Sequence, residues 1–143
     1  MELIRRLLFN MDSKFYVSLE AARLLKEKGY DRECIAYYQN DEFRPYSLTR
    51  SGLSMYNKNA APDYMNQYSA PTKDEAIDWL ESKGIIVQTI PSTPNIWRWR
   101  IFSMKYITYD DHTEDSKILY TTRLEAEEAA IINALKLLKL ELL

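Results

Sequence analysis

The chain has 143 residues, of which 46% are hydrophobic and 28% charged, and its formal net charge is −2. A chain of this length buries roughly 70% of the surface that it exposes when unfolded, so it can form a hydrophobic core without metal ions or disulfide bonds. The composition excludes wholesale disorder, and the negative charge excludes an overall attraction for nucleic acid, although a local basic patch remains compatible with it. With only three glycines and five prolines the chain has no flexible linker, and we predict a single domain over residues 1–143.

The N-terminal stretch "MELIRRLLFN" contains an apolar run that is too short for a signal peptide, and no small-residue cleavage pattern follows it. Met11 opens an equally natural start, so we expect residues 1–12 to be a peripheral helix or a dispensable extension. No run of 18 apolar residues is present, which argues against a membrane span. The single cysteine, Cys34, excludes an internal disulfide and fits a reducing cytoplasm.

Three helices are predicted by the residues that can cap their first turns. "SLEAARLLKEKG" begins with Ser18, "TKDEAIDWLESKG" with Thr72 and "TRLEAEEAAIINALKLL" with Thr122. Each hydroxyl can accept a hydrogen bond from a free amide of the first turn. Glu75 and Glu125 lie three residues after the two threonines and complete capping boxes.

The first two helices are also predicted to end alike. Gly29 and Gly84 each follow a lysine at the end of the apolar pattern, where a left-handed residue closes a helix. Strand-like sequence follows both glycines, "CIAYY" in the first case and "IIVQTI" in the second. The recurrence could reflect an internal duplication, but any helix-to-strand connection uses the same residues, and we favour this second interpretation.

The strands of the first half are predicted around a turn. "QNDE" after Tyr38 favours a turn, because Asn and Asp tolerate unusual backbone dihedrals, and "FRPYSL" can return as a second strand. Pro45 cannot donate to a strand ladder, so this strand should lie at a sheet edge. Residues 49–71 show neither helical nor strand periodicity and are predicted to be a long loop, which in a compact domain is usually functional or mobile.

The second half is predicted to form a meander of three strands. They are residues 85–90, a long strand from about Ile96 to Tyr109, and "KILYTT", with the turn "PSTPN" and an acidic loop "DDHTED" between them. Together with the first hairpin this gives an α+β fold. We expect an antiparallel sheet of about four or five strands with three main helices packed mostly on one face.

The stretch "NIWRWRIFSM" alternates tryptophan with arginine. In a strand, Trp97 and Trp99 point to one face while Arg98, Arg100 and Phe102 point to the other. We favour a tryptophan face that packs on helices and an arginine face in solvent. The alternative is a nucleic-acid surface, in which the two arginines contact phosphates and Phe102 stacks on a base.

Tyrosine is abundant, and several copies gather in the predicted loop. Its large ring and polar hydroxyl suit protein interfaces, although the rings could instead complete the core over an open sheet face. The sequence leaves both interpretations open. The residues concerned are Tyr46, Tyr56, Tyr64 and Tyr68, with Met55 and Met65 among them.

The last helix is apolar on more than one side. Its predicted core stripe comprises Leu124, Ile131, Leu135, Leu138 and Leu142. Leu137, Leu140 and Leu143 fall outside this stripe, so either the N-terminal "LIRRLLF" or a second copy of the protein is expected to cover them. The second alternative makes the protein a homo-oligomer through its C-terminal helix.

Residues for catalysis or metal binding are sparse. His112 is the only histidine and lies in the acidic run, where Asp110, Glu114 and Asp115 could in principle hold a cation. That run lacks the central glycine and distal glutamate of a calcium-binding loop, so we predict no metal site. The sequence offers no phosphate-binding glycine loop, nucleophile elbow or histidine pair, and we predict no enzymatic activity and no cofactor.

The segments "LEAARLLKEKGY", "CIAYYQND", "YSAPTKDEAIDWLESKGI" and "RLEAEEAAIINALKLL", in this order, resemble a group of uncharacterised small proteins from gut-bacterial genomes, prophages and mobile elements. The resemblance covers most of residues 13–140, and its motifs are helix caps and helix stops. It implies no activity, catalytic residue or ligand. The long loop and the N-terminal extension are where this chain is expected to depart from the group.

From these patterns we expect a cytoplasmic, non-catalytic accessory protein of phage or mobile-element type that binds an unidentified protein partner. Two alternatives stay open. One is a nucleic-acid-associated protein that uses Arg98 and Arg100, although the charge disfavours it, and the other is a structural homo-oligomer.

Overall fold

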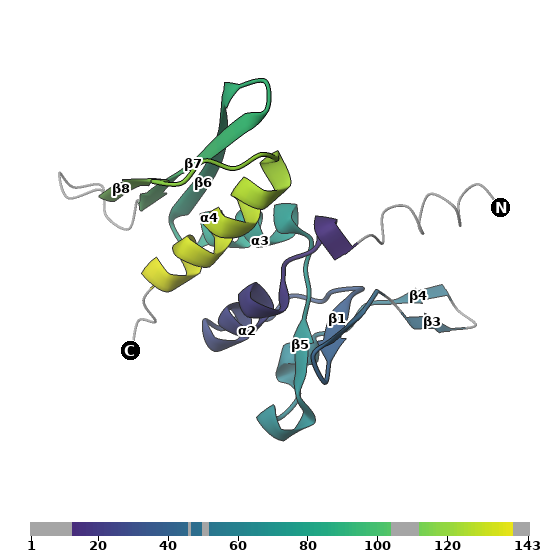
Figure 1. The fold of residues 1–143 in the computed structure, drawn as a ribbon. Helices are drawn as coiled ribbons and strands as arrows, with labels where there is room; N and C mark the ends of the chain where they lie inside the picture. Colours follow the sequence, from purple (N-terminus) through teal and green to yellow (C-terminus); the bar gives the residue numbers. More distant parts are fainter. Residues whose placement is uncertain (1–12, 46, 50–51, 104–111, 139–143) are drawn as a thin grey trace. The chain divides into compact units, whose positions relative to one another are not determined.

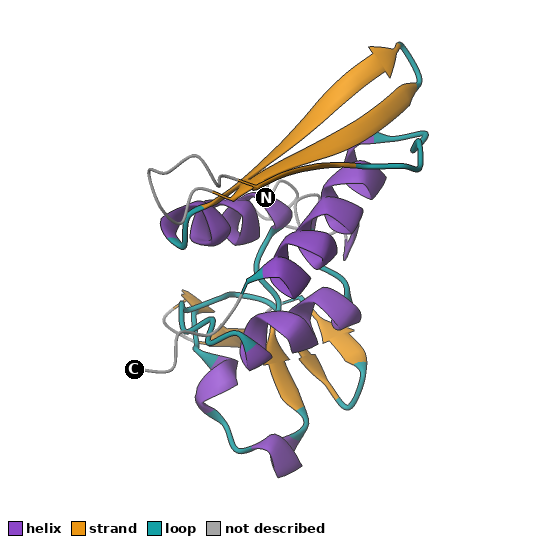
Figure 2. Cartoon of the chain, turned by 90° about the vertical axis from the view of Figure 1, so that its left-hand side faces the viewer, coloured by secondary structure: helices purple, strands orange, loops and turns teal. Residues whose placement is uncertain are grey.

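The computed structural model describes residues 13–45, 47–49, 52–103 and 112–138 of the chain (Figure 1). The fold is α+β, as predicted, and the chain forms two compact units, residues 1–72 and residues 73–143. Each unit combines helix with a three-stranded antiparallel sheet (Figure 2). In place of the predicted single sheet of about four or five strands, the described residues form two three-stranded sheets and one two-stranded sheet.

The described part of unit 1 begins with a 3₁₀ turn, η1 (Ser13–Phe15), and its one α-helix is α2 (Leu19–Glu27). The helix starts as predicted, because the Ser18 hydroxyl accepts a hydrogen bond of 3.2 Å from the amide of Ala21. It also ends as predicted, since Gly29 adopts a φ of 92°, where a side chain would be strained.

The sheet of unit 1 has its first strand in the centre. Its members are β1 (Tyr37–Gln39), β2 (Glu42–Arg44) and β5 (Gln67–Ser69), in the order β2-β1-β5. Asn40 and Asp41 make the two-residue turn between β1 and β2 with φ values of 50° and 68°, which suits the twist of a hairpin. The strand before Pro45 lies at the sheet edge, as the proline predicted.

Residues 49–71 are not the irregular loop that the sequence suggested. The segment contains strand β4 (Gly52–Ser54), which pairs with β3 (Ser47–Thr49), the 3₁₀ turns η2 (Lys58–Ala60) and η3 (Asp63–Met65), and the edge strand β5. Each of these elements is three residues long, which is too short to show a period of two. Their regular structure depends on hydrogen bonds to distant residues, which the local sequence does not reveal.

In unit 1, aromatic rings from β1, β2 and the segment before α2 pack together. The ring of Phe43 lies between those of Tyr16 and Tyr38, with centroid distances of 5.3 and 5.5 Å. The Tyr38 hydroxyl is buried and donates a 2.8 Å hydrogen bond to the carbonyl of Val17, so its polar end is satisfied. Cys34 is buried as well.

Unit 2 contains the other two predicted helices, α3 (Lys73–Ser82) and α4 (Arg123–Leu137). The Thr122 hydroxyl accepts a 3.2 Å hydrogen bond from the amide of Glu125, and Gly84 has a φ of 87° after α3. These observations confirm the predicted start of α4 and the predicted end of α3. The C-terminal helix ends earlier than its apolar pattern suggested, because Leu138 is already extended, and Leu140, Leu142 and Leu143 lie outside the described residues.

The sheet of unit 2 is a meander of β6 (Ile85–Thr93), β7 (Ile96–Ser103) and β8 (His112–Asp115). Helix α4 packs against β6 and β7, and α3 packs against β6. The buried side chains of the two long strands come from alternate positions, as expected for a sheet with one face on helices. They are Ile85, Val87, Trp99 and Ile101, which share the core with Ala130, Ile131 and Leu135.

The third strand of this meander is "HTED" and not "KILYTT". Asp115 pairs with Arg100, the amide of Ser116 donates to the carbonyl of Trp99, and Tyr120 then forms an isolated bridge with Trp97. Residues 117–119 therefore do not pair with β7, although the residues on either side of them, Ser116 and Tyr120, are hydrogen-bonded to Trp99 and Trp97. Acidic residues are tolerated in β8 because Arg100 lies opposite Asp115, a charge pairing between distant segments that sequence alone did not predict.

Among the described residues, no helix is both long enough and apolar enough to cross a lipid bilayer.

Candidate functional site

The described residues of unit 1 expose large hydrophobic side chains only near the two ends of residues 55–65. Tyr64 is 84% exposed, while Met55, Tyr56 and Met65 are each about half exposed. We call these four residues the Tyr/Met surface. Exposed tyrosine and methionine are enriched at protein interfaces, because tyrosine gives a large contact at low entropic cost and methionine adapts its shape to a partner.

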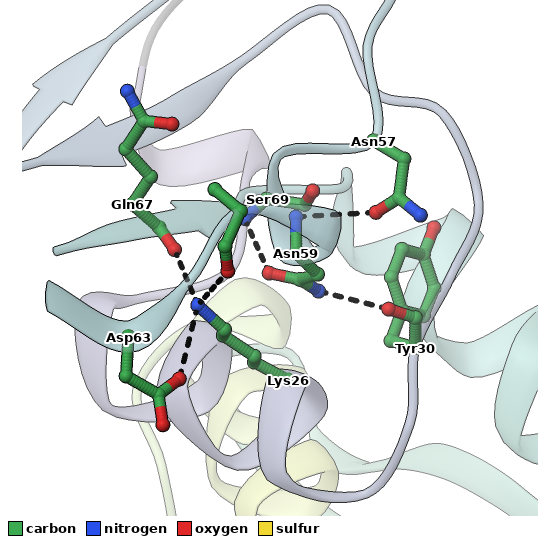
Figure 3. A network of polar contacts seen from close by, with 8 residues as sticks. Lys26, Tyr30, Asn57, Asn59, Asp63, Gln67 and Ser69 are labelled. Carbon is green, nitrogen blue, oxygen red and sulfur yellow. Dashed lines mark hydrogen bonds and ion pairs between the residues drawn. The ribbon is translucent and has the colours of Figure 1, made fainter. Parts of the chain in front are cut away.

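A lysine on α2 holds the segment that carries this surface (Figure 3). The Nζ of Lys26 donates hydrogen bonds of 3.1 Å to the carbonyl of Ala61 and 3.2 Å to the carbonyl of Gln67, and lies 3.4 Å from a carboxylate oxygen of Asp63. The three donors of the ammonium group therefore all have an acceptor. The side chain of Lys26 is only 13% exposed, so its ammonium group makes these contacts largely out of reach of solvent.

Asn59 ties the same segment to the chain after α2. Its side-chain oxygen accepts a 2.9 Å hydrogen bond from the amide of Ser69, and its side-chain nitrogen donates a 2.9 Å hydrogen bond to the carbonyl of Tyr30 (Figure 3). The amide of Asn59 itself donates to the side chain of Asn57. Both the oxygen and the nitrogen of the Asn59 side-chain amide are hydrogen-bonded. A side chain with only a donor or only an acceptor at this position would therefore lose one of the two hydrogen bonds.

Backbone hydrogen bonds complete the attachment. Cys34 and Tyr56 exchange hydrogen bonds of 2.9 and 3.1 Å, the amide of Ala70 donates to Ala36, and the amide of Asn40 donates to Asn66. The segment is thus hydrogen-bonded along both of its arms to residues 34–40. A segment held in this way loses little conformational entropy when a partner binds it.

The tyrosines that the sequence grouped together have different surroundings. Tyr68 lies partly buried beneath two cations of α2, with Arg23 and Lys26 at 5.7 and 5.2 Å from its ring centroid. Lys58 lies 4.9 Å from the ring of Tyr56 and 4.6 Å from that of Tyr37. Tyr68 therefore contributes to the packing of unit 1, whereas Tyr64 points into solvent. Tyr46 lies outside the described residues.

The side chains of the tryptophan–arginine strand lie on two opposite faces of β7, as their alternation predicted. Trp99 is buried on the helix-facing side of β7 and Trp97 is partly buried, whereas Arg98 is exposed and Phe102 partly exposed on the other side. Arg100 is already paired, since its Nε donates a 2.6 Å hydrogen bond to a carboxylate oxygen of Asp115. This hydrogen bond lowers the pKa of Asp115 and raises that of Arg100. The face thus offers a phosphate less positive charge than its sequence suggests.

Buried charges occur where α3 begins against α4. Lys73 and Glu127 are both buried, and Arg123 lies 3.2 Å from a carboxylate oxygen of Glu127. Burial lowers the pKa of Lys73, an effect that Glu128, Glu127 and Glu125 oppose, and burial raises the pKa of Glu127. A lysine with a lowered pKa can belong to a catalytic site or to a structural ion network. The surrounding carboxylates are typical of the second.

The remaining predicted site residues are not brought together. Leu137 is partly exposed in the last turn of α4, and its companions Leu140 and Leu143 lie outside the described residues. In the acidic run, His112, Glu114 and Asp115 belong to β8 and Asp110 lies outside the described residues. Among the described residues, no three histidine, cysteine or acidic side chains are grouped in a way that could hold a metal ion.

The sequence pattern pointed to Tyr56 and Tyr64, which are exposed, but not to Lys26 and Asn59, which hold their segment in place. Lys26 lay inside the first predicted helix with no feature that marked it, and Asn59 was one of several asparagines in the predicted loop. No signal in the local sequence distinguishes Asn59 from Asn57, because its partners are ten and twenty-nine residues away.

Comparisons with known proteins give no relative: no protein-family model matches the chain, and no curated protein or solved structure shows a significant match to it.

Proposed function

We propose that the chain is a non-catalytic binding module that engages a protein partner through the Tyr/Met surface. The observation that carries this proposal is the combination of exposed Tyr64 and Met65 with the hydrogen bonds of Lys26 and Asn59 on either side of them. A mobile loop would have to be ordered on binding, which costs affinity. Here the order is supplied by residues of unit 1.

The type of partner follows from the residues of the surface. Tyrosine and methionine contribute apolar contact area, the tyrosine hydroxyl adds a hydrogen bond, and Asp63 next to Tyr64 is almost fully exposed. Such a surface suits a folded protein with a shallow apolar depression and a basic residue at its rim. We further propose a cytoplasmic accessory role of phage or mobile-element type, which is supported by the resemblance of the helix and turn motifs described above.

The experiment uses a photo-reactive amino acid at position 64 of the full chain, produced in its native host, with position 20 as the matched control. Glu20 is also exposed in unit 1, on α2 and outside the segment. We expect a dominant adduct with one protein from position 64 and none from position 20. The identified partner is then purified, and its affinity for Tyr64→Ala is expected to fall at least about tenfold.

Equal affinity of the purified partner for wild type and Tyr64→Ala would refute the proposed surface. The nucleic-acid alternative is weaker, because Arg100 is neutralised by Asp115. The homo-oligomer through Leu137, Leu140 and Leu143 stays a separate proposal, and a monomer at high concentration in light scattering would remove it.

A further inference from the structure

Two methionines belong to the Tyr/Met surface, one beside each of its tyrosines. Met55 precedes Tyr56 and is 50% exposed, and Met65 follows Tyr64 and is 42% exposed. Peroxides oxidise methionine to its sulfoxide, and a thioether at the surface reacts without prior unfolding of the chain. Both side chains are therefore open to this chemistry in the folded protein.

The one thiol of the chain is less accessible than these thioethers. Cys34 is 4% exposed, and its sulfur lies 3.8 Å from the hydroxyl of Tyr30 and 3.7 Å from the carbonyl of Arg32. A buried thiol has little contact with a dissolved oxidant. Among the sulfur atoms of the described residues, those of Met55 and Met65 are thus the ones that a peroxide reaches first.

The backbone beside both methionines is held by hydrogen bonds that do not involve sulfur. The amide of Met65 donates a 3.0 Å hydrogen bond to the carbonyl of Pro62, and the carbonyl of Met65 accepts one of 3.1 Å from Nε2 of Gln39. Next to Met55, Tyr56 is fixed by the backbone hydrogen bonds described above. None of these contacts is lost when a sulfur atom gains an oxygen, so oxidation leaves the fold of unit 1 in place.

We propose that Met55 and Met65 form a peroxide-sensitive modification site that lowers the affinity of the Tyr/Met surface for its partner; the effect on affinity rests on the proposed function. In each reaction the sulfur lone pair attacks one oxygen of hydrogen peroxide, an S–O bond forms and the O–O bond breaks. Sulfur is oxidised by two electrons, and the departing hydroxide takes up a proton and leaves as water. A thiol-dependent reductase converts the resulting sulfoxide back to the thioether.

The sulfoxide changes the property on which binding through this surface depends. A thioether is apolar and adapts its shape, whereas a sulfoxide carries a polar oxygen that an apolar depression on a partner leaves without a hydrogen bond. Burial of such an unsatisfied polar group is expected to lower the affinity at least about tenfold. The ring and hydroxyl of Tyr64 are unchanged, so oxidation weakens the surface and does not remove it.

The first test is peptide mapping by mass spectrometry after treatment of the full-length protein with hydrogen peroxide. We expect Met55 and Met65 to be oxidised within about threefold of their rates in the urea-unfolded chain, because each is about half exposed, and Cys34 to react later than both. Protection of the Ser69 and Ala70 amides from hydrogen exchange should be unchanged. Rates at the two methionines more than about tenfold below those of the unfolded chain, earlier oxidation of Cys34, or loss of this protection would overturn the proposal.

The second test compares partner binding before and after oxidation. The chain is treated with peroxide, the peroxide is removed with catalase, and the purified partner captured through position 64 is then added. Wild type should lose affinity at least about tenfold and regain it with a methionine sulfoxide reductase. The double variant Met55→Leu with Met65→Leu should have the same affinity before and after peroxide, since leucine has no sulfur. No loss in wild type, or equal losses in the two proteins, would overturn the proposal, whereas the proposed function fails separately, when Tyr64→Ala binds as well as wild type.

Discussion

The Nζ of Lys26 on α2 lies 3.2 Å from the carbonyl oxygen of Gln67, a residue 41 positions later in the chain. The same ammonium group reaches the carbonyl of Ala61, so one side chain closes the edge of β5 and holds the segment that carries Tyr64. The stability of unit 1 and the shape of the proposed binding surface therefore depend on the same contact.

Replacing Lys26 by methionine tests this contact. Methionine retains the apolar stem and removes the donors, which leaves the carbonyls of Ala61 and Gln67 without the partner that Lys26 supplies. We expect the free energy of unfolding to fall by about 2 kcal/mol, as measured by urea denaturation. Asp63→Asn is the control. Because the Asp63 side chain is 99% exposed, no measurable loss is expected. Equal effects of the two changes would show that the ion pair, and not the carbonyl contacts, matters.

Asp115 should titrate below the usual range of aspartate. The hydrogen bond from Arg100 lowers its pKa, so any stabilisation is present above the unfolded pKa of about 3.9 and is lost as pH falls through the lower folded pKa. Carboxyl NMR should show this lowered pKa in wild type and a rise toward the usual value in Arg100→Gln. An unchanged titration in Arg100→Gln would contradict the pairing.

Glu127 should behave in the opposite way. Burial raises its pKa, so the folded state binds this proton more tightly than the unfolded chain. Stability contributed by the protonated group is full below the unfolded pKa of about 4.3 and is lost as pH rises through the folded pKa. Unfolding measured across this window should show that Glu127→Gln gains stability relative to wild type as pH rises. A stability difference between Glu127→Gln and wild type that stays constant across this pH window would contradict the effect of burial on this group.

Binding to single-stranded nucleic acid should be absent even at low salt. Arg100 is paired with Asp115, which leaves Arg98 as the exposed arginine on the outer face of β7. One cation is too few for a phosphate-binding surface. Fluorescence anisotropy with a labelled oligonucleotide tests this expectation. Salt-dependent binding by wild type that Arg98→Ala removes would restore the nucleic-acid alternative.

Local signals in the sequence predicted the parts of the fold that local forces determine. The caps at Ser18 and Thr122 and the helix stops at Gly29 and Gly84 act within a few residues, and all four were predicted correctly. The placement of Trp99 and Arg98 on opposite faces of the sheet was also predicted, because successive side chains of a strand alternate between its two faces. The apparent repetition of helix, glycine and strand does not extend to topology, since the central strand is the first of the sheet in unit 1 and the second in unit 2.

The errors concern pairing between distant segments. Strand β5 exists because β1 lies beside it, and the hydrophilic β8 exists because Arg100 and Trp99 supply partners. Neither segment shows a periodicity that a local pattern could reveal. For the same reason the sequence identified Tyr56 and Tyr64 as candidates, but did not separate them from Tyr68, which packs beneath Arg23 and Lys26.

Amide hydrogen exchange on the isolated protein tests the central claim most directly, namely that residues 55–70 are ordered before any partner binds. We predict protection of the amides of Tyr56, Ser69 and Ala70, which are bound by Cys34, Asn59 and Ala36. Protection of Ser69 should fall in Asn59→Ala, while that of the Trp97 amide in unit 2 stays unchanged. Exchange of Tyr56, Ser69 and Ala70 at the rate of an unfolded chain would contradict the account.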